Sequence, residues 1–330
     1  MKHKKIIVWG AKMDTGHTHA FVHHAIVRAA EYLSLPMYWL DNRDNLDESF
    51  FDDSLIISEQ WLVFQNGVSN KLPLRPTSTY IINYLGNKGR VEGNPGAEMY
   101  LGKVKKLIDF RFACNWGIDG TADKNWSYSF DKELYIPIND GTSYYDFGST
   151  YDRFYSIWAT DLLPNEIDFD TRFTEFKEPK YAFFGGTIRE DNQDVFLPFI
   201  NACEKEKIPF VYNSPWNNPR TIEQIRKAVI ESYLPLDVRP QNHLKYGYIS
   251  CRSIKNVSYG ALGLTNSKPT YDFFDGEIAY AENSADLFYI AKEMQENPKT
   301  KDLILNQMKK VKEKHTYVNR LNDMIIASEL

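Results

Sequence analysis

The sequence predicts an α/β fold built from two successive domains, and three observations lead to this prediction. Residues 5–9 form a short, β-branched apolar run that ends at Gly10, as a buried strand does. A loop, a helical pattern and a second strand follow it, and the same order begins again near residue 181. The chain has 330 residues, which is too long for one ordinary core and suits two domains.

In the first half, the pattern after the opening strand predicts a helix from Thr18 to Tyr32 and a strand at 37–40 that ends at Asp41 and Asn42. A strand, helix and strand in this order predict a parallel sheet. Further strands are expected at 54–57 and 79–84. Residues 85–150 have no clear periodicity, and we predict irregular structure there.

The second half of the chain repeats this alternation of strands and helices. A strand at 181–184, a turn at 185–187, a helix at 194–206 and a strand at 209–212 form another α/β unit. A helix is expected at 252–261, with strands at 262–265 and 278–281 and amphipathic helices over 284–313. The two units join between about 150 and 178, and a last helix opens at 315–321.

Composition narrows the functional class. The net charge of −5 gives no basic excess for nucleic acid, so no nucleic-acid partner is expected. The three cysteines, Cys114, Cys203 and Cys251, are odd in number and widely spaced, which argues against a disulfide framework. The apolar run within the opening MKHKKIIVWG is too short for the apolar region of a signal peptide, and no apolar run approaches the roughly 20 residues of a membrane span. We therefore expect a cytoplasmic protein without a transmembrane segment.

A glycine pair follows the strand at 181–184. Gly185 and Gly186 let the backbone approach a ligand closely, and N–H groups at the next helix start can hold phosphate. Thr187 continues this turn, and Arg189 has the planar, bidentate charge that suits a diphosphate. The alternative is a plain tight turn with a surface arginine.

A second candidate lies in the segment GYISCRSIKNVSYGALG at 247–263. If Arg252 begins a helix, Lys255 and Asn256 share its face one turn later. Two cations and an amide at a helix N-terminus would favour a diphosphate. The alternative is a basic, solvated helix edge, but the small and apolar neighbours favour a buried helix.

Four of the seven histidines lie close together in the first strand–helix loop and helix. His17 or His19 is a candidate general base, with Asp14 to orient it. Ligands of α/β sheets bind outside the carboxyl ends of strands, where this loop lies. A metal site is a second interpretation, because His17, His19 and His23 have ligand spacing. The plainest interpretation is a helix cap at Thr18 with surface histidines.

The segment WATDLLPNEI at 158–167 lies at the predicted join. A hinge is normally polar, yet this segment has a tryptophan and two leucines around Asp161, which suggests that it lines a cleft. Alternatively, Asp161 caps the turn before Pro164. The nearby Asp168-Phe169-Asp170 has the form of a metal-binding acidic triplet, but it does not follow an early strand, so we discount it.

These motifs together resemble glycosyltransferases of the two-domain GT-B fold, over nearly the whole chain. The turn at 185–189 and Arg252 are similar to the donor-binding turn and helix start of the phage DNA β-glucosyltransferase type. The resemblance implies two Rossmann-like domains facing each other across a cleft. It places an acceptor-binding domain at 1–160, a linker at 161–178, a nucleotide-sugar-binding domain at 179–314 and a helix crossing back at 315–330.

The resemblance also implies an activity: transfer of a hexosyl or deoxyhexosyl group from a UDP- or GDP-sugar to a hydroxyl of a carbohydrate acceptor, with no cofactor and no metal. The implied catalytic residues are His17 or His19 with Asp14, and Asp161 in second place. The chain departs from the pattern at Asn256, where many members have glutamate. The implied donor-binding residues are Gly185, Gly186, Thr187, Arg189, Arg252, Lys255, Asn256 and Ser258.

Three other functions fit the sequence less well. A metal-dependent hydrolase would use the His17, His19 and His23 cluster, but only His243 and His315 remain downstream as further ligands. A nicotinamide oxidoreductase would need G-x-G-x-x-G at the first turn, and residues 10–16 do not fit it. A non-catalytic sugar- or nucleotide-binding protein is disfavoured by the arginine, lysine and histidine side chains.

Overall fold

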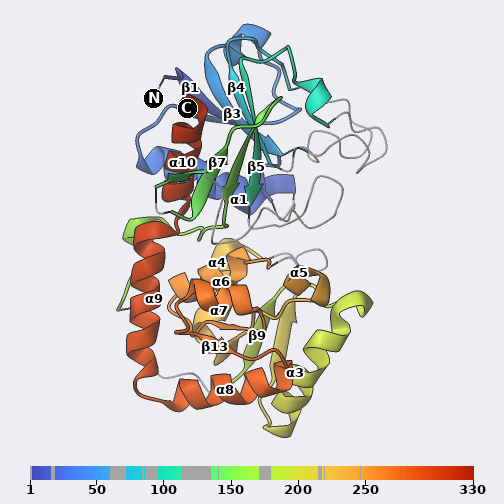
Figure 1. The fold of residues 1–330 in the computed structure, drawn as a ribbon. Coiled ribbons are helices and arrows are strands. Elements are labelled where there is room, and N and C mark those ends of the chain that lie inside the picture. The colour runs from blue at the N-terminus through green and yellow to red at the C-terminus, as the bar shows by residue number, and fades with distance from the viewer. Residues whose placement is uncertain are drawn as a thin grey trace. The chain divides into compact units, whose positions relative to one another are not determined.

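A computed structural model describes residues 2–15, 19–59, 72–83, 85, 96–112, 135–139, 141–170, 180–214, 218, 220–245 and 247–330. The chain divides into two compact units (Figure 1). Unit 1 contains Met1–Ile157 and Tyr317–Leu330, and unit 2 contains Trp158–Thr316. Each unit has parallel strands with helices packed on them, so the predicted α/β class is confirmed.

Unit 1 is organised around one eight-stranded sheet in the order β2-β1-β3-β4-β5-β8-β7-β6. The strands from β2 to β8 in this order are parallel, and β7 and β6 add an antiparallel edge. The strand bounds are β1 Lys5–Trp9, β2 Met37–Leu40, β3 Ser54–Glu59, β4 Thr79–Asn83, β5 Lys106–Phe112, β6 Tyr135–Ile138, β7 Ser143–Asp146 and β8 Asp152–Ser156.

Both faces of this sheet are buried, because alternate residues of each strand point to opposite sides. One face, with Ile7, Ile56 and Tyr80, belongs to a core cluster that includes Phe51 and Tyr100. The helices α1 (Ala20–Tyr32) and α10 (Tyr317–Glu329) pack on each other and on strands of the sheet. Short 3-10 helices lie at η1 Met13–Thr15, η2 Glu48–Phe51 and η4 Gly96–Met99.

The last helix is an integral part of unit 1 although it comes from the end of the sequence. The ring of Tyr317 packs edge-on against Phe112 of β5, with centroids 6.2 Å apart. Arg320 is fully buried, and its Nε donates a hydrogen bond of 2.9 Å to the carbonyl of Ile157. Unit 1 is therefore completed only by a segment that follows all of unit 2 in the chain.

Unit 2 contains two small groups of parallel strands. Three strands, β9 (Ala182–Gly185), β10 (Phe210–Asn213) and β11 (Leu234–Pro235), pair in the order β10-β9-β11. A second pair, β12 (Leu264–Thr265) and β13 (Ala279–Tyr280), is connected to them by a parallel bridge between Asp237 and Thr265. The helices are α3 Gln193–Lys205, α4 Ile222–Glu231, α5 Gln241–Lys245, α6 Cys251–Ser258, α7 Lys268–Phe273, α8 Ser284–Glu296 and α9 Thr300–Lys314, with 3-10 turns at η5 Pro164–Glu166 and η6 Glu190–Asn192.

Aromatic side chains form the core of unit 2. Phe184 of β9 packs on Phe196 of α3 with ring centroids 4.5 Å apart, and Phe199 meets Phe288 of α8 edge-on at 5.4 Å. These contacts bring α3 and α8 together against the strands, while α6 packs on α9 (Figure 1). The core therefore holds β9 firmly at the start of the Gly185–Gly186 turn.

The predicted elements outside residues 85–150 are present with shifts of a few residues at their ends. The first helix begins at Ala20, and the predicted helix over 252–261 spans 251–258. The prediction of irregular structure over 85–150 was wrong, because β5, β6 and β7 lie there. Among the described residues, no helix is long and apolar enough to cross a lipid bilayer.

Candidate functional site

The carboxyl ends of the strands in unit 2 bring polar groups to one edge of the sheet. Gly185 ends β9, Asn213 ends β10, Thr265 ends β12, and Asp237 follows β11 by two residues. Because these strands are parallel, their carboxyl ends lie at the same edge, which is where α/β sheets bind ligands.

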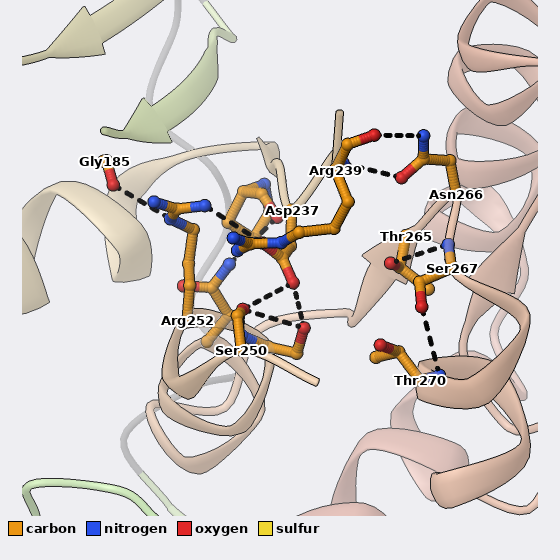
Figure 2. A network of polar contacts seen from close by, with 12 residues as sticks. Gly185, Asp237, Arg239, Ser250, Arg252, Thr265, Asn266, Ser267 and Thr270 are labelled. Carbon is orange, nitrogen blue, oxygen red and sulfur yellow. Dashed lines mark hydrogen bonds and ion pairs between the residues drawn. The ribbon is translucent and has the colours of Figure 1, made fainter. Parts of the chain in front are cut away.

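Asp237 is the centre of a polar network at this edge (Figure 2). Its carboxylate is 1% exposed and accepts hydrogen bonds from four side chains. Arg252 Nη1 lies 3.0 Å from Oδ1, which Arg239 also contacts, and Ser250 Oγ donates to Oδ2 over 2.8 Å, as Ser253 does. Burial alone would raise the pKa of Asp237, but Arg239, Arg252 and the hydroxyl of Ser253 outweigh it and lower the pKa. The carboxylate is therefore ionised at neutral pH.

Arg252 is held by the start of α6 and by the glycine turn after β9. Ser250 caps the helix by accepting a bond from the backbone of Ser253, and Arg252 follows within the first turn. The Nε of Arg252 donates to the carbonyl of Gly185 over 2.8 Å. A Cβ on Gly186 would lie 2.6 Å from Nη2 of Arg252, so this position has no room for a side chain. Gly186 thus makes space for the guanidinium.

Arg239 enters the network from the opposite side and is fixed through its backbone. Asn266 accepts from the backbone N–H of Arg239 over 2.7 Å and donates to its carbonyl over 3.0 Å. The guanidinium lies 5.5 Å from the centre of the Tyr248 ring. Within the described part of the chain, the buried Nε of Arg239 has no hydrogen-bond partner.

The network carries an excess of positive charge, because two guanidiniums share one carboxylate. Burial and the nearby charge of Arg239 lower the pKa of Arg252, although an arginine stays protonated in proteins. Burial and the charges of the same two arginines lower the pKa of His243 to about 4, so this imidazole is neutral near pH 7. An anion is the ligand that such a site favours.

Lys255, a predicted donor-binding residue, lies one turn along α6 and pairs with Asp161. The Nζ of Lys255 is 3.2 Å from Oδ2 of Asp161, and Tyr259 donates to Oδ1 over 2.7 Å. Burial favours a raised pKa for Asp161, but Lys255 and Tyr259 outweigh it and lower the pKa. Both oxygens of the buried Asp161 carboxylate therefore have partners on α6 or directly after it, and these bonds attach the segment after β8 to α6.

Two further predicted residues of α6 make bonds within the protein. Asn256 is 3% exposed and donates to the carbonyl of Pro235 over 3.1 Å. Ser258 Oγ lies 2.7 Å from the hydroxyl of Thr160. Both residues pack the helix against neighbouring segments, and their predicted roles in donor binding stay predictions.

The rest of the glycine turn leads away from Asp237. Thr187 Oγ1 lies 3.1 Å from the hydroxyl of Ser214, at the end of β10. Arg189 lines an open groove of about 860 Å³ between α3 and β10, with Leu197 and Tyr212 among its other lining residues. The structure therefore brings Gly185, Gly186 and Arg252 together and places Arg189 along the groove.

Unit 1 has its own polar cluster at the carboxyl ends of β3 and β4. Glu59 and Asn83 are direct neighbours in the sheet, and Oε1 of Glu59 accepts from Asn83 over 3.1 Å. The Nδ1 of His19 lies 2.6 Å from the same oxygen. Burial would raise the pKa of Glu59, but His19 and the other donors outweigh it and lower the pKa. A buried, ionised carboxylate thus orients His19.

The other residues of the predicted histidine site lie differently. Asp14 does not face His19, because its exposed carboxylate pairs with Arg43 at 2.6 Å. His17 lies outside the described residues. His23 is buried, and its Nδ1 lies 3.3 Å from the carbonyl of Ala11. In the described ranges, no three His, Cys, Asp or Glu side chains gather as a metal site does, so the hydrolase interpretation is not supported.

Sequence reasoning missed Asp237, Arg239 and Glu59. Each acid is the first charged residue after an apolar strand, in Leu234-Pro235-Leu236-Asp237 and in residues 54–59. In a parallel sheet, that position is the carboxyl end of a strand, and this signal would have singled out both carboxylates.

No protein-family model matches the sequence, and no curated protein matches it. Among solved structures, the chain is similar to an α1,3-fucosyltransferase, with a TM-score of 0.48 and 12% identity over 98% of this chain and 88% of that one. It is also similar to a trehalose-6-phosphate synthase, with a TM-score of 0.44 and 11% identity over 93% and 77% of the two chains. A third is a Listeria monocytogenes protein described as a UDP-N-acetylglucosamine 2-epimerase, with a TM-score of 0.41 and 9% identity over 99% and 96%. At these scores, the similarities do not by themselves assign an activity.

Proposed function

We propose that the chain is a GT-B glycosyltransferase that transfers a hexosyl or deoxyhexosyl group from a UDP- or GDP-sugar to a hydroxyl of a glycan. The observation that carries this proposal is the pair of guanidiniums on Asp237, next to the side-chain-free Gly186. When a sugar leaves its donor, negative charge grows on the diphosphate. Cations already fixed at that position stabilise the transition state without reorganisation.

Arg252 is the residue we assign to the donor phosphates. Its side chain is 22% exposed, whereas Asp237 behind it is 1% exposed, so an anion can reach the guanidinium but not the carboxylate. Its bonds to Gly185 and Asp237 fix two sides of the guanidinium. Because arginine supplies the compensating charge, the proposed transfer needs no divalent metal ion.

His19 is the general base in this proposal. With the Nδ1 proton donated to Glu59, the lone pair of the imidazole is on Nε2. As the acceptor oxygen bonds to the anomeric carbon, the bond from that carbon to the donor phosphate oxygen breaks, and the hydroxyl proton passes to Nε2. Glu59 then stabilises the imidazolium. Such general-base catalysis contributes typically about 10²–10⁴-fold.

Two other residues, His17 and Asp161, are weaker candidates for the general base. His17 is close to His19 in the sequence and lies outside the described residues, so the geometry supports only His19. Asp161 already accepts from Tyr259 and pairs with Lys255, which leaves its oxygens occupied. If the reaction retains configuration at the anomeric carbon, no enzymic base of this kind is required, and His19 then positions the acceptor.

A thermal-shift screen tests the proposal directly. The full chain is heated with UDP-, GDP-, CMP- and dTDP-sugars and with the free nucleotides. A ligand at a hundred times its Kd stabilises the fold by about 2.7 kcal/mol, which raises the Tm visibly. Each ligand that binds is then tested for sugar transfer to glycan acceptors and for hydrolysis. Absence of any shift with all four donor classes would contradict the proposal.

Arg252→Ala is the variant that tests the site. Loss of one charge-assisted bond to phosphate costs roughly 1.5–3 kcal/mol, so nucleotide affinity should fall by about one to two decades. Lys292→Ala is the matched control, because it also removes one cation from unit 2 but breaks only a pair with Glu206 at 2.6 Å. Equal nucleotide affinity in folded Arg252→Ala and in the control would refute the assignment.

A further inference from the structure

The strand β10 lies at the edge of its sheet, and among the described strands it has a neighbour only on the β9 side. The backbone N–H of Ala182 in β9 donates to the carbonyl of Pro209 over 2.8 Å. Because the backbone groups of successive residues in a ladder alternate in direction, Val211 also directs its groups toward β9. Phe210 and Tyr212 therefore direct theirs outward. Such a row of outward-facing backbone groups is a template for pairing with another strand.

The side chains along this edge are apolar and exposed. Val211 is 36% exposed, and Tyr212 and Leu197 are exposed as well. Phe210, Tyr212 and Leu197 line the groove between α3 and β10. Proteins usually protect a free edge strand with lysines or a bulge, but β10 contains no charged residue. An apolar edge of this kind is expected to be covered by a partner.

Exposed charges line the two ends of the same groove. Arg189 and Glu190 follow the carboxyl end of β9 and precede α3. Glu204 lies in the last turn of α3, and Lys207 precedes β10. Because β9 and β10 are parallel, the first pair of charges lies beside the end of β10 and the second pair beside its start. Within the described ranges, none of these four side chains forms an ion pair.

We propose that two copies of this chain pair through β10 in antiparallel orientation, about a two-fold axis at Val211. Phe210 of one copy then exchanges backbone hydrogen bonds with Tyr212 of the second copy, and Val211 faces its own counterpart across the axis. The two grooves become continuous on the side of α3. This interaction surface goes beyond the proposed function and does not depend on it.

Charge complementarity favours a second copy over an unrelated strand. A two-fold axis across β10 places the end of one strand beside the start of the other. Arg189 of one copy then faces Glu204 of the second copy. Glu190 likewise faces Lys207. Since the symmetry repeats both contacts, every exposed charge of the groove meets a charge of opposite sign, and this arrangement also fixes the register of the strands.

Sedimentation velocity of the full chain measures the pairing from about 0.1 to about 100 µM, the range in which modest interfaces dissociate. The wild type is expected to change from monomer to dimer within this range. Val211→Lys places like charges directly opposite each other at the axis, so it should raise the Kd of the dimer by at least about tenfold. Ile290→Lys is the matched control, because Ile290 of α8 is 37% exposed and does not line the groove. It should leave the Kd unchanged.

A charge exchange tests the register. Glu204→Lys alone should raise the Kd by about threefold or more, because the introduced cation meets Arg189 of the second copy. Adding Arg189→Glu to the same chain should restore the wild-type Kd. Within one copy the two positions are separated by most of α3, which has 13 residues and is therefore about 20 Å long. Restoration of the dimer thus reports a contact between copies.

Three outcomes would overturn the inference. One is a wild type that remains monomeric at the highest concentration, which would leave this edge to an extended segment of another protein. Another is a dimer that Val211→Lys and Ile290→Lys weaken equally. The third is a dimer that Glu204→Lys weakens and Arg189→Glu does not restore, and this result decides if circular dichroism shows that Val211→Lys is unfolded. Because these measurements use no nucleotide sugar, their result is independent of the proposed transfer.

Discussion

Replacing Gly186 by alanine tests the site without removing any charge. The added Cβ would lie 2.6 Å from Nη2 of Arg252 and 2.7 Å from the ring of Phe184. Real Cβ contacts do not occur at such distances, so one of the two neighbours must move. Phe184 is 3% exposed and packs on Phe196, so the less constrained Arg252 is expected to move.

The expected magnitude follows from the bonds that this movement strains. A shift of about 1 Å takes Arg252 out of reach of Gly185 or Asp237, where its bonds measure 2.8 and 3.0 Å. Overpacking of this kind costs about 1–3 kcal/mol in the free energy of unfolding. Nucleotide affinity should fall by about ten- to a hundredfold, because the guanidinium no longer faces the phosphates. Urea unfolding and calorimetric titration measure the two effects.

Gly185→Ala is the matched control for this prediction. Its Cβ would meet Phe183 at 3.5 Å, which is an ordinary van der Waals distance. We therefore expect unchanged nucleotide affinity and a free energy of unfolding equal to the wild type or about 0.4–1 kcal/mol higher. If Gly186→Ala behaves like Gly185→Ala in both measurements, the position of Arg252 beside the glycine turn is not what nucleotide binding requires.

Three more predictions concern Glu59, Asp237 and the need for a metal ion. Glu59→Gln should lower kcat by about ten- to a hundredfold with little change in donor affinity, because the imidazolium of His19 loses a charged partner. Equal kcat values for the variant and the wild type in steady-state kinetics would contradict this prediction. The folded pKa of Asp237 lies below its ordinary value of 3.8, so its contribution to stability is complete above that pH and is lost as the pH falls through the lower, folded value. Urea titrations between about pH 2 and 6 should therefore give a steeper acid loss of stability in the wild type than in Asp237→Asn, and parallel curves would refute the linkage. Sugar transfer should survive EDTA, and loss of activity that Mn²⁺ restores would show that a metal ion is required.

The sequence predicted the inner strands of unit 1 well because they are buried on both faces. Such strands appear as continuous apolar runs, as in Lys5–Trp9 and Ser54–Ile57. The strand β5 was missed because Asp109 and Arg111 interrupt its apolar run. In the structure these two side chains form a buried ion pair at 2.8 Å, so the charges are compatible with a central strand. A single sequence does not reveal that the two charges compensate each other.

The site residues that the sequence predicted have local signals, whereas those it did not predict depend on contacts between distant segments. Gly185, Gly186 and Arg252 were identified by local features, a glycine pair after a strand and a helix start. The position of Glu59 at the end of an apolar strand marks it as a candidate, but its partner His19 lies 40 positions away and is identified only in the folded chain. The partners of Asp237 are likewise identified only in the folded chain. Partnerships of this kind are set by tertiary structure, and periodicity does not encode them.

The discontinuity of unit 1 has a consequence for biosynthesis. A ribosome makes β1 before unit 2 and α10 only after every residue of unit 2, and α10 supplies buried contacts such as that of Arg320 with Ile157. Unit 2 is one uninterrupted segment, Trp158–Thr316, and can complete its core during translation. Unit 1 must instead wait for α10 with an apolar patch over α1 and part of its sheet uncovered. Unit 1 can therefore complete its fold only after the whole of unit 2 has been synthesised.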